Sequence, residues 1–302
     1  MKKLLGVIFI FIVSVNLLFA DNESYKLSGD VRVKSQSNWE QGYDHYLKCE
    51  ATVGLNFNFP ETWMQTKLKM SNTYETPEFS LIQLEIQQLL IGYSISAGDN
   101  HSFFMEVGRN KLENLFESKI QYDNHFNGLH LSYNIENPHG NVTIHGGPHI
   151  INSDLDHYGF IGEIIVKNPL TSNFTLKYSL TDWLDTKDSS PDYQYLISQA
   201  LIKYQIDENL GIYGAYLINH KATNSFRGFY LGMSYGNVSK ANDWMIDFNY
   251  QNLQSSAIPN FDTSGIGTGM QLKSAYAMTD NFSIQGKINT KKYMEIAAIY
   301  KW

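Results

Sequence analysis

The chain has 302 residues, one cysteine and a formal net charge of −7 at neutral pH. A single cysteine excludes an internal disulfide framework and a cysteine-rich zinc site, and the acidic balance argues against a nucleic-acid-binding protein, which usually carries a basic face. Mean hydropathy is −0.30, and only the N-terminal apolar run approaches the ~18 residues of a membrane-spanning helix, which excludes a helical multi-pass membrane protein.

The N-terminal segment has the plan of a secretory signal peptide. Lys2 and Lys3 form a positive region, residues 4–19 are a short apolar stretch, and Ala20 precedes a polar sequence. A membrane anchor is the alternative, but the run is short for a span and contains Asn16. We therefore expect export through the inner membrane and cleavage near Ala20.

The rest of the chain alternates apolar and polar residues, the pattern of a half-buried β-strand. Between Leu47 and Phe57 every second residue is apolar or small, while Lys48 and Glu50 stand among the polar residues between them. Most such segments are about 9–13 residues long, the length of a tilted strand that crosses a bilayer. The sixteen segments begin near Tyr25, Asp44, Thr62, Phe79, Ser102, His125, Asn141, His157, Ser172, Gln194, Leu210, Phe226, Asp243, Gly267, Phe282 and Tyr293.

Two of these segments need comment. From Ile82 to Ile95 the apolar residues fall first on positions 82, 84 and 86 and then on 89, 91, 93 and 95. This change of side predicts a β-bulge near Gln87-Gln88. The segment from Asn141 to Ile151 is weak, and fourteen strands result if it lies outside the sheet.

A soluble β-sandwich also alternates, but two features favour a membrane barrel. Charges stand in mid-strand on the polar faces while the other faces stay apolar, as expected for an aqueous lumen and a lipid-facing outside. Aromatic residues gather at segment ends, where a membrane–water interface places them. They are Phe57, Phe59, Trp63, Tyr74, Tyr93, Trp183, Tyr204, Trp244, Tyr250, Tyr276, Tyr300 and Trp302. The sequence therefore predicts an all-β transmembrane antiparallel up-and-down β-barrel over residues 21–302, as a single domain that follows the signal peptide over residues 1–20.

The connections give a second indication of the same architecture. If the N-terminus lies in the periplasm, the odd connections face outward, and three of them are long: 109–124, 183–193 and 253–266. The even connections are compact and rich in Asn, Asp and Pro, which turns favour. Long outer loops and short periplasmic turns are typical of outer-membrane barrels.

Three stretches resemble bacterial outer-membrane porins. The chain ends in an alternating segment, 294–302, that is similar to the C-terminal signature read by the barrel-assembly machinery, although these proteins usually end in Phe rather than Trp302. The opening 27–33 resembles a first porin strand, and 107–110 followed by 126–133 resembles a porin pattern in which Asn127 here replaces Asp. The resemblance implies that Ile296, Ala298, Tyr300 and Trp302 form the assembly signal.

The resemblance also implies a constriction loop between the fifth and sixth strands. In general porins the loop at this place folds into the lumen, and here it spans 109–124. An ordinary exposed loop is the alternative. The charged residues that the loop contributes are Arg109, Lys111, Glu113, Glu117, Lys119 and Asp123.

Strand parity places a set of cations on the inner faces of neighbouring strands. Once the last strand lies beside the first, these residues form one basic wall, interrupted by Asp30, Glu50 and Glu295. Charged patches of this kind select ions by sign, although such charges can also simply keep a lumen hydrated. The basic wall suggests anions, while the acidic total suggests cations. The wall consists of Arg32, Lys34, Lys48, Lys67, Lys69, Lys273 and Lys287.

Other functions are also open to a barrel of this kind. A phospholipase or protease would need a nucleophile beside an oriented base, and the hydrophilic residues near one hairpin tip are His145, His149, Asn152, Ser153, Asp154, Asp156 and His157. Inward His130, His145 and His149 show no closed metal-ligand spacing, so we expect neither a metal nor a cofactor. A plugged structural or adhesive barrel is a further alternative.

The sequence thus favours a porin in the outer membrane of a Gram-negative bacterium, not an enzyme. It would be a passive diffusion channel for small hydrophilic solutes or ions. Its expected partners are outer-membrane lipid, the barrel-assembly machinery and the permeating solutes, with no nucleic acid. A homotrimer, common among porins, and a monomer are both compatible with the composition.

Overall fold

The computed structural model describes residues 25–38, 44–75, 78–79, 82–96, 98, 100–111, 125–137, 140–150, 157–169, 173–185, 195–258 and 268–302. Within these ranges every regular element is a β-strand. No helix there is long and apolar enough to cross a membrane. The predicted signal peptide, residues 1–20, lies outside the described residues.

The first eight strands run to the middle of the chain. They are β1 (Tyr25–Asn38), β2 (Asp44–Asn58), β3 (Thr62–Glu75), β4 (Glu78–Phe79), β5 (Gln83–Ser96), β6 (His101–Lys111), β7 (His125–Ile135) and β8 (Asn141–Ile150). The remaining strands are β9 (His157–Lys167), β10 (Phe174–Asp185), β11 (Tyr195–Gln205), β12 (Leu210–Asn219), β13 (Arg227–Gly236), β14 (Trp244–Leu253), β15 (Thr268–Ala277), β16 (Phe282–Asn289) and β17 (Tyr293–Lys301).

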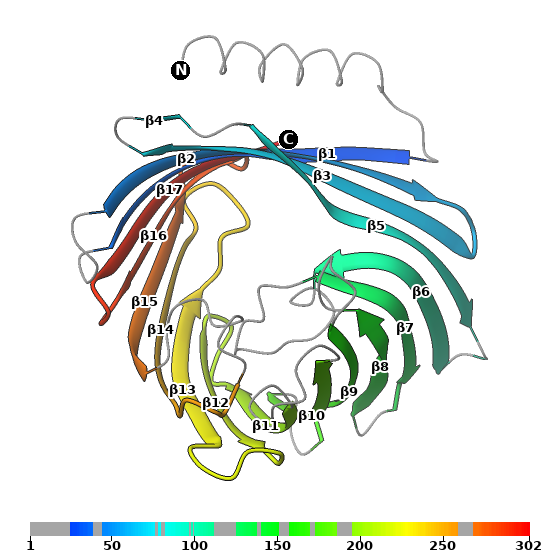
Figure 1. Ribbon diagram of the computed structural model, residues 1–302. Helices are drawn as coiled ribbons and strands as arrows, with labels where there is room; N and C mark the ends of the chain where they lie inside the picture. Colours follow the sequence, from blue (N-terminus) through cyan, green and yellow to red (C-terminus); the bar gives the residue numbers. More distant parts are fainter. Residues whose placement is uncertain are drawn as a thin grey trace.

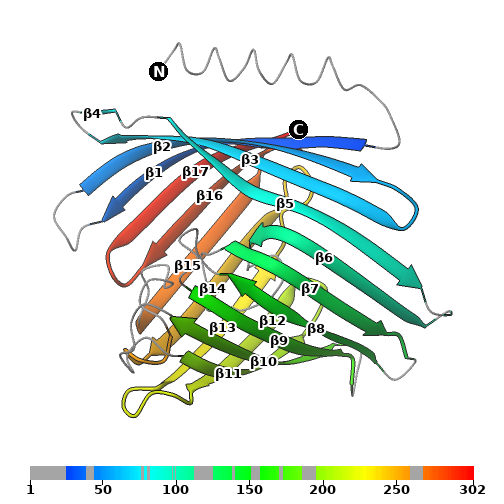
Figure 2. The ribbon, with the colours of Figure 1, turned by 45° about the vertical axis from the view of Figure 1, so that its right-hand side comes forward.

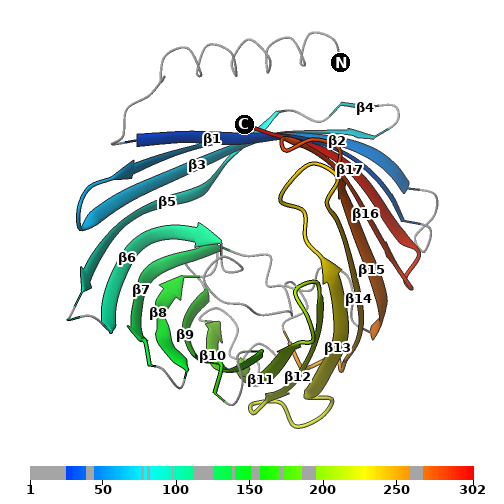
Figure 3. The same ribbon diagram turned by 180° about the vertical axis from the view of Figure 1, so that it is seen from behind.

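The strands close into one barrel, as predicted. Each pairs antiparallel with its neighbours along the chain, and β17 pairs with β1 to complete the ring. The two-residue β4 only extends the edge of β3, which pairs directly with β5, so sixteen of the described strands make the wall. Figures 1 and 3 show the strands curving round a central space from opposite sides, and Figure 2 shows β6 to β10 running obliquely side by side.

Two irregular strands keep their place in the wall. The register between β3 and β5 shifts so that Lys67 faces Gln88 and Leu68 faces Ile86, which leaves Gln87 as an extra residue. The predicted β-bulge is therefore confirmed. The weak segment is β8, which pairs with both β7 and β9 although it contains Pro148, a residue without a backbone N–H. This excludes the fourteen-strand alternative.

Burial identifies the two faces of the wall. In β12, Ile212 and Tyr216 are 43% and 44% exposed, whereas the residues that follow them, Tyr213 and Leu217, are 6% and 1% exposed. Because opposite residues in an antiparallel pair lie on one side of the sheet, this alternation carries round the ring. The outer surface is therefore apolar, as a lipid-facing barrel requires, and its most exposed members include Leu84, Ile91, Ile202, Leu231, Ile284 and Ile296.

The ring is closed by a tight contact between the two end strands. Gly29 and Trp302 exchange backbone hydrogen bonds of 3.3 and 3.1 Å. The Trp302 ring lies so close that a Cβ on Gly29 would approach it to 2.1 Å and Thr52 O to 2.6 Å. This close approach of the two strands depends on the absence of a side chain at Gly29.

We therefore expect Gly29→Ala to loosen the closure of the barrel. Overpacking of this kind costs about 2 kcal/mol of the free energy of unfolding. Gly162→Ala is the matched control, because its Cβ would meet only Phe160, at 3.5 Å. Urea unfolding of both refolded variants measures the difference, and equal stability of the two would contradict the tight contact.

Short turns and long connections lie at opposite ends of the barrel. The connections on the same end as Tyr25 and Trp302 are short turns, such as 59–61 and 278–281, while the other end carries the long connections 112–124, 186–194 and 254–267. This alternation matches the sequence prediction. The boundaries differ by a few residues, since β10 continues through Trp183 to Asp185.

The turn between β13 and β14 is built on one carboxylate. Asp243 accepts hydrogen bonds from the Lys240 backbone N–H and from the backbone N–H and hydroxyl of Ser239, at 2.8 to 3.1 Å. These hydrogen bonds lower the pKa of Asp243 below its ordinary value of 3.8. The bond from the Lys240 backbone N–H has the largest effect, and the bonds from Ser239 come next.

A group whose pKa is lowered in the folded state stabilises the fold above its unfolded pKa, and this contribution disappears as the pH falls through the folded-state pKa. We expect the difference in free energy of unfolding between the native protein and Asp243→Asn to be constant above about pH 5 and to shrink below that. Urea titrations at a series of pH values measure it. A difference that grows on acidification would contradict this role.

Candidate functional site

The inner face of the barrel is the candidate site, because it is where the charged residues of the strands collect. In β1 to β3 the predicted parity is confirmed by contacts between side chains on neighbouring strands. Lys34 of β1, Lys48 of β2 and Lys69 of β3 all reach the carboxylate of Glu50 on β2. These four residues therefore share the inner face.

Glu50 is the centre of this cluster. Its carboxylate lies 2.9 Å from Lys34 Nζ, 3.3 Å from Lys48 Nζ and 3.0 Å from Lys69 Nζ, and only 7% of its side chain is exposed. The sequence treats Glu50 as an interruption of a basic wall. The structure shows instead that it holds three of the cations together.

The cluster continues along the wall toward β5 and β7. Lys69 Nζ also lies 3.6 Å from Glu85 Oε2, and His125 Nε2 lies 3.3 Å from Glu85 Oε1. Registers place the other predicted cations on the same inner side. Arg32 is opposite Glu50, Lys67 is opposite Gly54, and Lys273 is opposite both Asp247 and Lys287.

The basic side of the lumen therefore also carries carboxylates that accept hydrogen bonds, so its charge is mixed rather than uniformly positive. Asp247 accepts hydrogen bonds from the Tyr213 hydroxyl at 3.0 Å. Glu295 accepts from the Tyr293 hydroxyl at 2.8 Å, and Lys287 Nζ lies 5.4 Å from the centre of the Tyr293 ring. The inner surface on this side therefore carries mixed charge that is held in ordered contacts.

The predicted constriction loop begins later than the sequence suggests. Arg109 and Lys111 are in β6, whose pairing with β7 extends to Lys111. Arg109 shares the outer side with Val107 and donates to Ile86 O and Asn127 Oδ1. Placing these two residues in a loop is therefore wrong, because the alternating pattern of the strand runs through them. Glu113, Glu117, Lys119 and Asp123 lie outside the described residues.

The opposite side of the lumen carries an apolar cluster that the sequence analysis missed. Its members project inward, between the exposed outer residues of the same strands, and all are at most 9% exposed. They come mainly from β9 to β13. The cluster consists of Phe126, Ile161, Trp183, Tyr195, Ile197, Leu201, Tyr213, Ala215, Leu217, Tyr230, Leu253, Ala257 and Ile258. We call it the inner apolar cluster.

Part of this cluster is a segment that follows β14. Ala257 is fully buried and Ile258 is 2% exposed. Gln254 N–H donates to Arg227 O and Ser256 N–H donates to Ser225 O, at 3.0 and 2.9 Å. The segment 254–258 therefore folds back over the inner side of β12 and β13.

Asn219, at the end of β12, fixes that segment. Its Oδ1 accepts from the backbone N–H groups of Leu196 and Lys221, and its Nδ2 donates to Ser256 O at 2.8 Å. The side chain is 1% exposed, and buried amides of this kind are costly to leave unpaired. Among the described residues, 254–258 is thus an inward-folded connection, at a different place from the predicted one.

Two of the predicted interfacial aromatics belong to the lumen. Trp183 is 3% exposed within the inner apolar cluster. Trp63 lies over Gly92 and donates from Nε1 to Glu106 Oε1 at 3.3 Å. Their assignment to the aromatic belt is wrong, because aromatic type and position at a strand end do not determine the side. Outward Trp244, Tyr276 and Tyr300 are 48%, 43% and 46% exposed.

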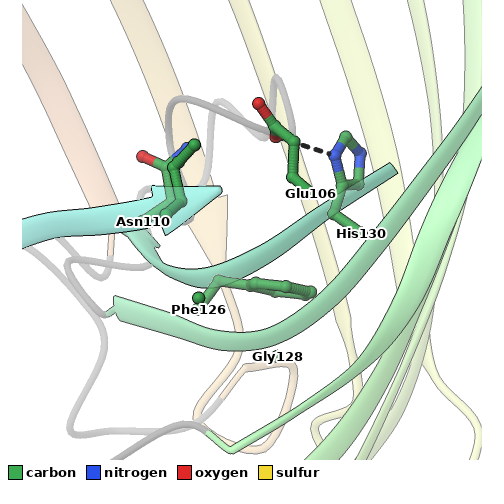
Figure 4. A pocket seen from close by; sticks show the side chains of 7 residues that line it. Glu106, Asn110, Phe126, Gly128 and His130 are labelled. Carbon is green, nitrogen blue, oxygen red and sulfur yellow. Dashed lines mark hydrogen bonds and ion pairs between the residues drawn. The ribbon is translucent and has the colours of Figure 1, made fainter. Parts of the chain in front are cut away.

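The inward histidines form a separate group on β7 and β8. His130 lies between Glu106 and His145, and His145 also contacts Glu163. His149 stacks on the Phe126 ring at 4.8 Å between centres. Figure 4 shows Glu106 and His130 pointing toward each other beside a small recess, which Leu90, Asn110 and Phe126 help to line.

The residues considered for enzyme or metal chemistry do not converge in the part of the chain that the structure describes. No group of three or more His, Cys, Asp or Glu side chains there is placed to hold a metal ion. Asn152, Ser153, Asp154 and Asp156 lie outside the described residues. His145 and His149 point to Glu163 and Phe126 respectively.

Comparisons with known proteins agree with this architecture. No protein-family model and no curated protein matches the sequence. Solved structures do match. OprB of Pseudomonas putida in its high-pH structure has a TM-score of 0.62 at 9% identity, covering 95% of this chain and 94% of that one. In its low-pH structure the TM-score is 0.59 at 11% identity, covering 96% and 95%.

A Rhodopseudomonas blastica porin, as a triple mutant, gives a TM-score of 0.56 at 10% identity over 92% of this chain and the whole of that one. The chain is a porin-like β-barrel. At these identities the likeness concerns the fold. The porin-like barrel nevertheless has its own inner surface, with a mixed-charge side centred on Glu50 and an apolar side held by Asn219.

Proposed function

We propose that this porin-like barrel is an outer-membrane channel for passive diffusion of small hydrophilic solutes or ions. The observation that carries the proposal is the contrast between the two faces of a closed ring. The outside presents exposed apolar side chains such as Ile91 and Leu231, and the inside presents the Glu50 cluster. A water-filled lumen accounts for charged residues at mid-strand. The porin fold supports a channel rather than an enzyme.

The same proposal covers the route to the membrane. Residues 1–20 direct export and are removed near Ala20, and the barrel-assembly machinery reads the last strand. In that strand Ile296 and Tyr300 are 50% and 46% exposed, while Ala297 and Ile299 are each 1% exposed. The alternation therefore presents one apolar outward row, Ile296, Ala298, Tyr300 and Trp302, to lipid and to the machinery. A homotrimer is the assembly that the likeness to porins suggests.

Solutes would pass between the two unlike sides of the lumen. Segment 254–258 and the inner apolar cluster occupy the side of β9 to β13, so the free path is displaced toward the cations of β1 to β3, β15 and β16. Residue charge along such a path selects ions by sign. We propose that Arg32, Lys34, Lys48, Lys67, Lys69, Lys273 and Lys287 favour anions, moderated by Glu50.

The test is the combined variant Arg32→Gln, Lys48→Gln and Lys67→Gln. A unit charge ~8 Å from a permeating ion changes the energy of that ion by about 0.5 kcal/mol in water, or about 0.2 kcal/mol with screening at physiological salt, and the change has opposite signs for an anion and a cation. Three such charges together therefore shift the anion-to-cation permeability ratio by roughly tenfold toward cations. The reversal potential across a salt gradient measures this ratio.

A second combined variant, Lys240→Gln, Lys291→Gln and Lys292→Gln, removes the same charge from turns outside the strands and is the control. We expect it to leave the ratio unchanged. An unchanged ratio in the lumen variant, with normal conductance, would overturn the assignment of the basic residues to the ion path.

A further inference from the structure

Four side chains, three buried and one half-buried, form a continuous hydrogen-bonded array across four strands of the inner wall. Glu106 Oε2 lies 3.2 Å from His130 Nδ1, His130 Nε2 lies 3.1 Å from His145 Nδ1, and His145 Nε2 lies 2.9 Å from Glu163 Oε2. The strands are β6, β7, β8 and β9. His130, His145 and Glu163 are 5%, 8% and 3% exposed.

The sheet register explains why the array is continuous. Glu106 is directly opposite His130, and His145 is directly opposite Glu163. His130 and His145 are diagonal neighbours on β7 and β8, within the reach of long side chains across a sheet. Next to His130, Gly147 leaves no room for a side chain, because a Cβ there would lie 1.7 Å from Leu129 O.

The contact between the two imidazoles is a head-to-head hydrogen bond. Their ring centres are 5.4 Å apart, close to the largest separation that a 3.1 Å contact between ring nitrogens allows. The two nitrogens therefore point at each other along one line. A metal ion ligated by both would require a bend at the metal, so the geometry favours a proton between them.

Counting protons then defines the state of the array. Each imidazole nitrogen carries either one proton or one lone pair, and an ionised carboxylate only accepts. Three consecutive hydrogen bonds need three protons, whereas two neutral imidazoles supply two. We propose that Glu106, His130, His145 and Glu163 form a binding site for one additional proton, which is shared by the two histidines between their carboxylates.

The charges balance in this state. Two carboxylates and one net imidazolium charge leave the array with a single negative charge. Trp63 Nε1 donates to the second oxygen of Glu106. The other described titratable groups on the inner faces of the neighbouring strands are Glu85, His149, Lys167, Lys177 and Lys203. His125, which is opposite Lys111 on the outer side, lies 3.3 Å from Glu85.

A different proton count would break the array. With a fourth proton, two N–H groups would face each other across the central contact. With only two protons, two lone pairs would face each other either at the contact between the two imidazoles or at one of the contacts between an imidazole and a carboxylate. The inner faces of β6 to β9 are therefore linked most firmly, at mid-strand, when the additional proton is bound.

Nitrogen-15 NMR of ring-labelled histidine in the refolded protein, in detergent micelles at pH 7, tests the proposal without depending on channel activity. His130→Gln and His145→Gln assign the signals, and Glu106→Gln and Glu163→Gln assign them if those two variants do not refold. We expect three protonated nitrogens over the two rings, with a scalar coupling across the central bond.

His101 is the internal reference, because its Nδ1 meets the Tyr133 hydroxyl at 2.8 Å and no carboxylate. Its ring should show no coupling to another imidazole. Two protonated nitrogens over His130 and His145, or four without coupling between the rings, would overturn the proposal.

Discussion

Replacing Glu50 with Gln is expected to produce the largest combined loss of stability and change in selectivity. Glu50 neutralises Lys34, Lys48 and Lys69 within 3.3 Å. Removing one partner of a buried ion pair leaves the other charges uncompensated and costs about 3 kcal/mol of the free energy of unfolding. Loss of one negative charge from the ion path also raises the anion-to-cation permeability ratio roughly twofold.

Both effects can be measured on one refolded sample, by urea unfolding and by the reversal potential in a salt gradient. Glu61→Gln is the matched control, because Glu61 lies exposed in a turn and accepts a hydrogen bond from the Tyr93 hydroxyl. Glu50→Gln behaving like Glu61→Gln in both measurements would show that the three lysines do not depend on Glu50.

Replacing Asn219 with Leu is expected to release segment 254–258 from the inner wall. The change keeps the branched shape of the side chain but leaves the Leu196 and Lys221 N–H groups and the Ser256 carbonyl without the partners they have here. Unpaired buried polar groups cost about 3 kcal/mol together. With the segment loosened, the lumen widens on the side of β12 and β13, and single-channel conductance rises.

Asn281→Leu serves as the comparison for this variant. Asn281 also donates from its side chain to a backbone carbonyl, Lys301 O at 2.8 Å, but it is exposed in a turn at the other end of the barrel. We expect its conductance to equal that of the native protein. If Asn219→Leu is destabilised and yet conducts like the native channel, segment 254–258 does not limit the path.

The wall of the barrel could be predicted almost entirely from the sequence because strands and turns are determined by residues that are close together in the chain. Alternation with a period of two determines which side chains meet lipid, and turn residues mark where strands end. The bulge at Gln87 could also be predicted from the sequence, since one extra residue shifts every later apolar residue from even to odd positions. The weak β8 paired because the loss of one N–H at Pro148 does not prevent pairing elsewhere along the strand.

The interior was predicted less well because it depends on contacts between distant parts of the chain. Parity placed Glu50 on the inner face but could not show three lysines reaching one carboxylate. Asn219 gave no signal, since two of its three partners, Leu196 and Ser256, are 23 and 37 residues away. One signal was present: β11 and β12 are apolar on both faces, as in Leu196, Ile197, Leu201 and Ile202, which indicates a strand buried on both sides.

The boundaries of the candidate site shifted for a related reason. Arg109 and Lys111 looked like loop residues because they are charged, yet backbone pairing with β7 keeps them in β6. Trp183 looked interfacial because it lies near a strand end, yet it packs into the inner apolar cluster. In both strands the residue type indicates an environment, but the pairing register of the strand determines which side of the barrel wall the residue occupies.

The central claim is that the closed barrel conducts, and the conductance of the refolded chain 21–302 in a planar bilayer tests it most directly. With a salt gradient across the membrane, the account predicts discrete conductance steps and a reversal potential of the sign expected for anions, set by the cations around Glu50. Protein that is shown to be folded and inserted but gives no steps would contradict it, and would indicate a plugged or enzymatic barrel.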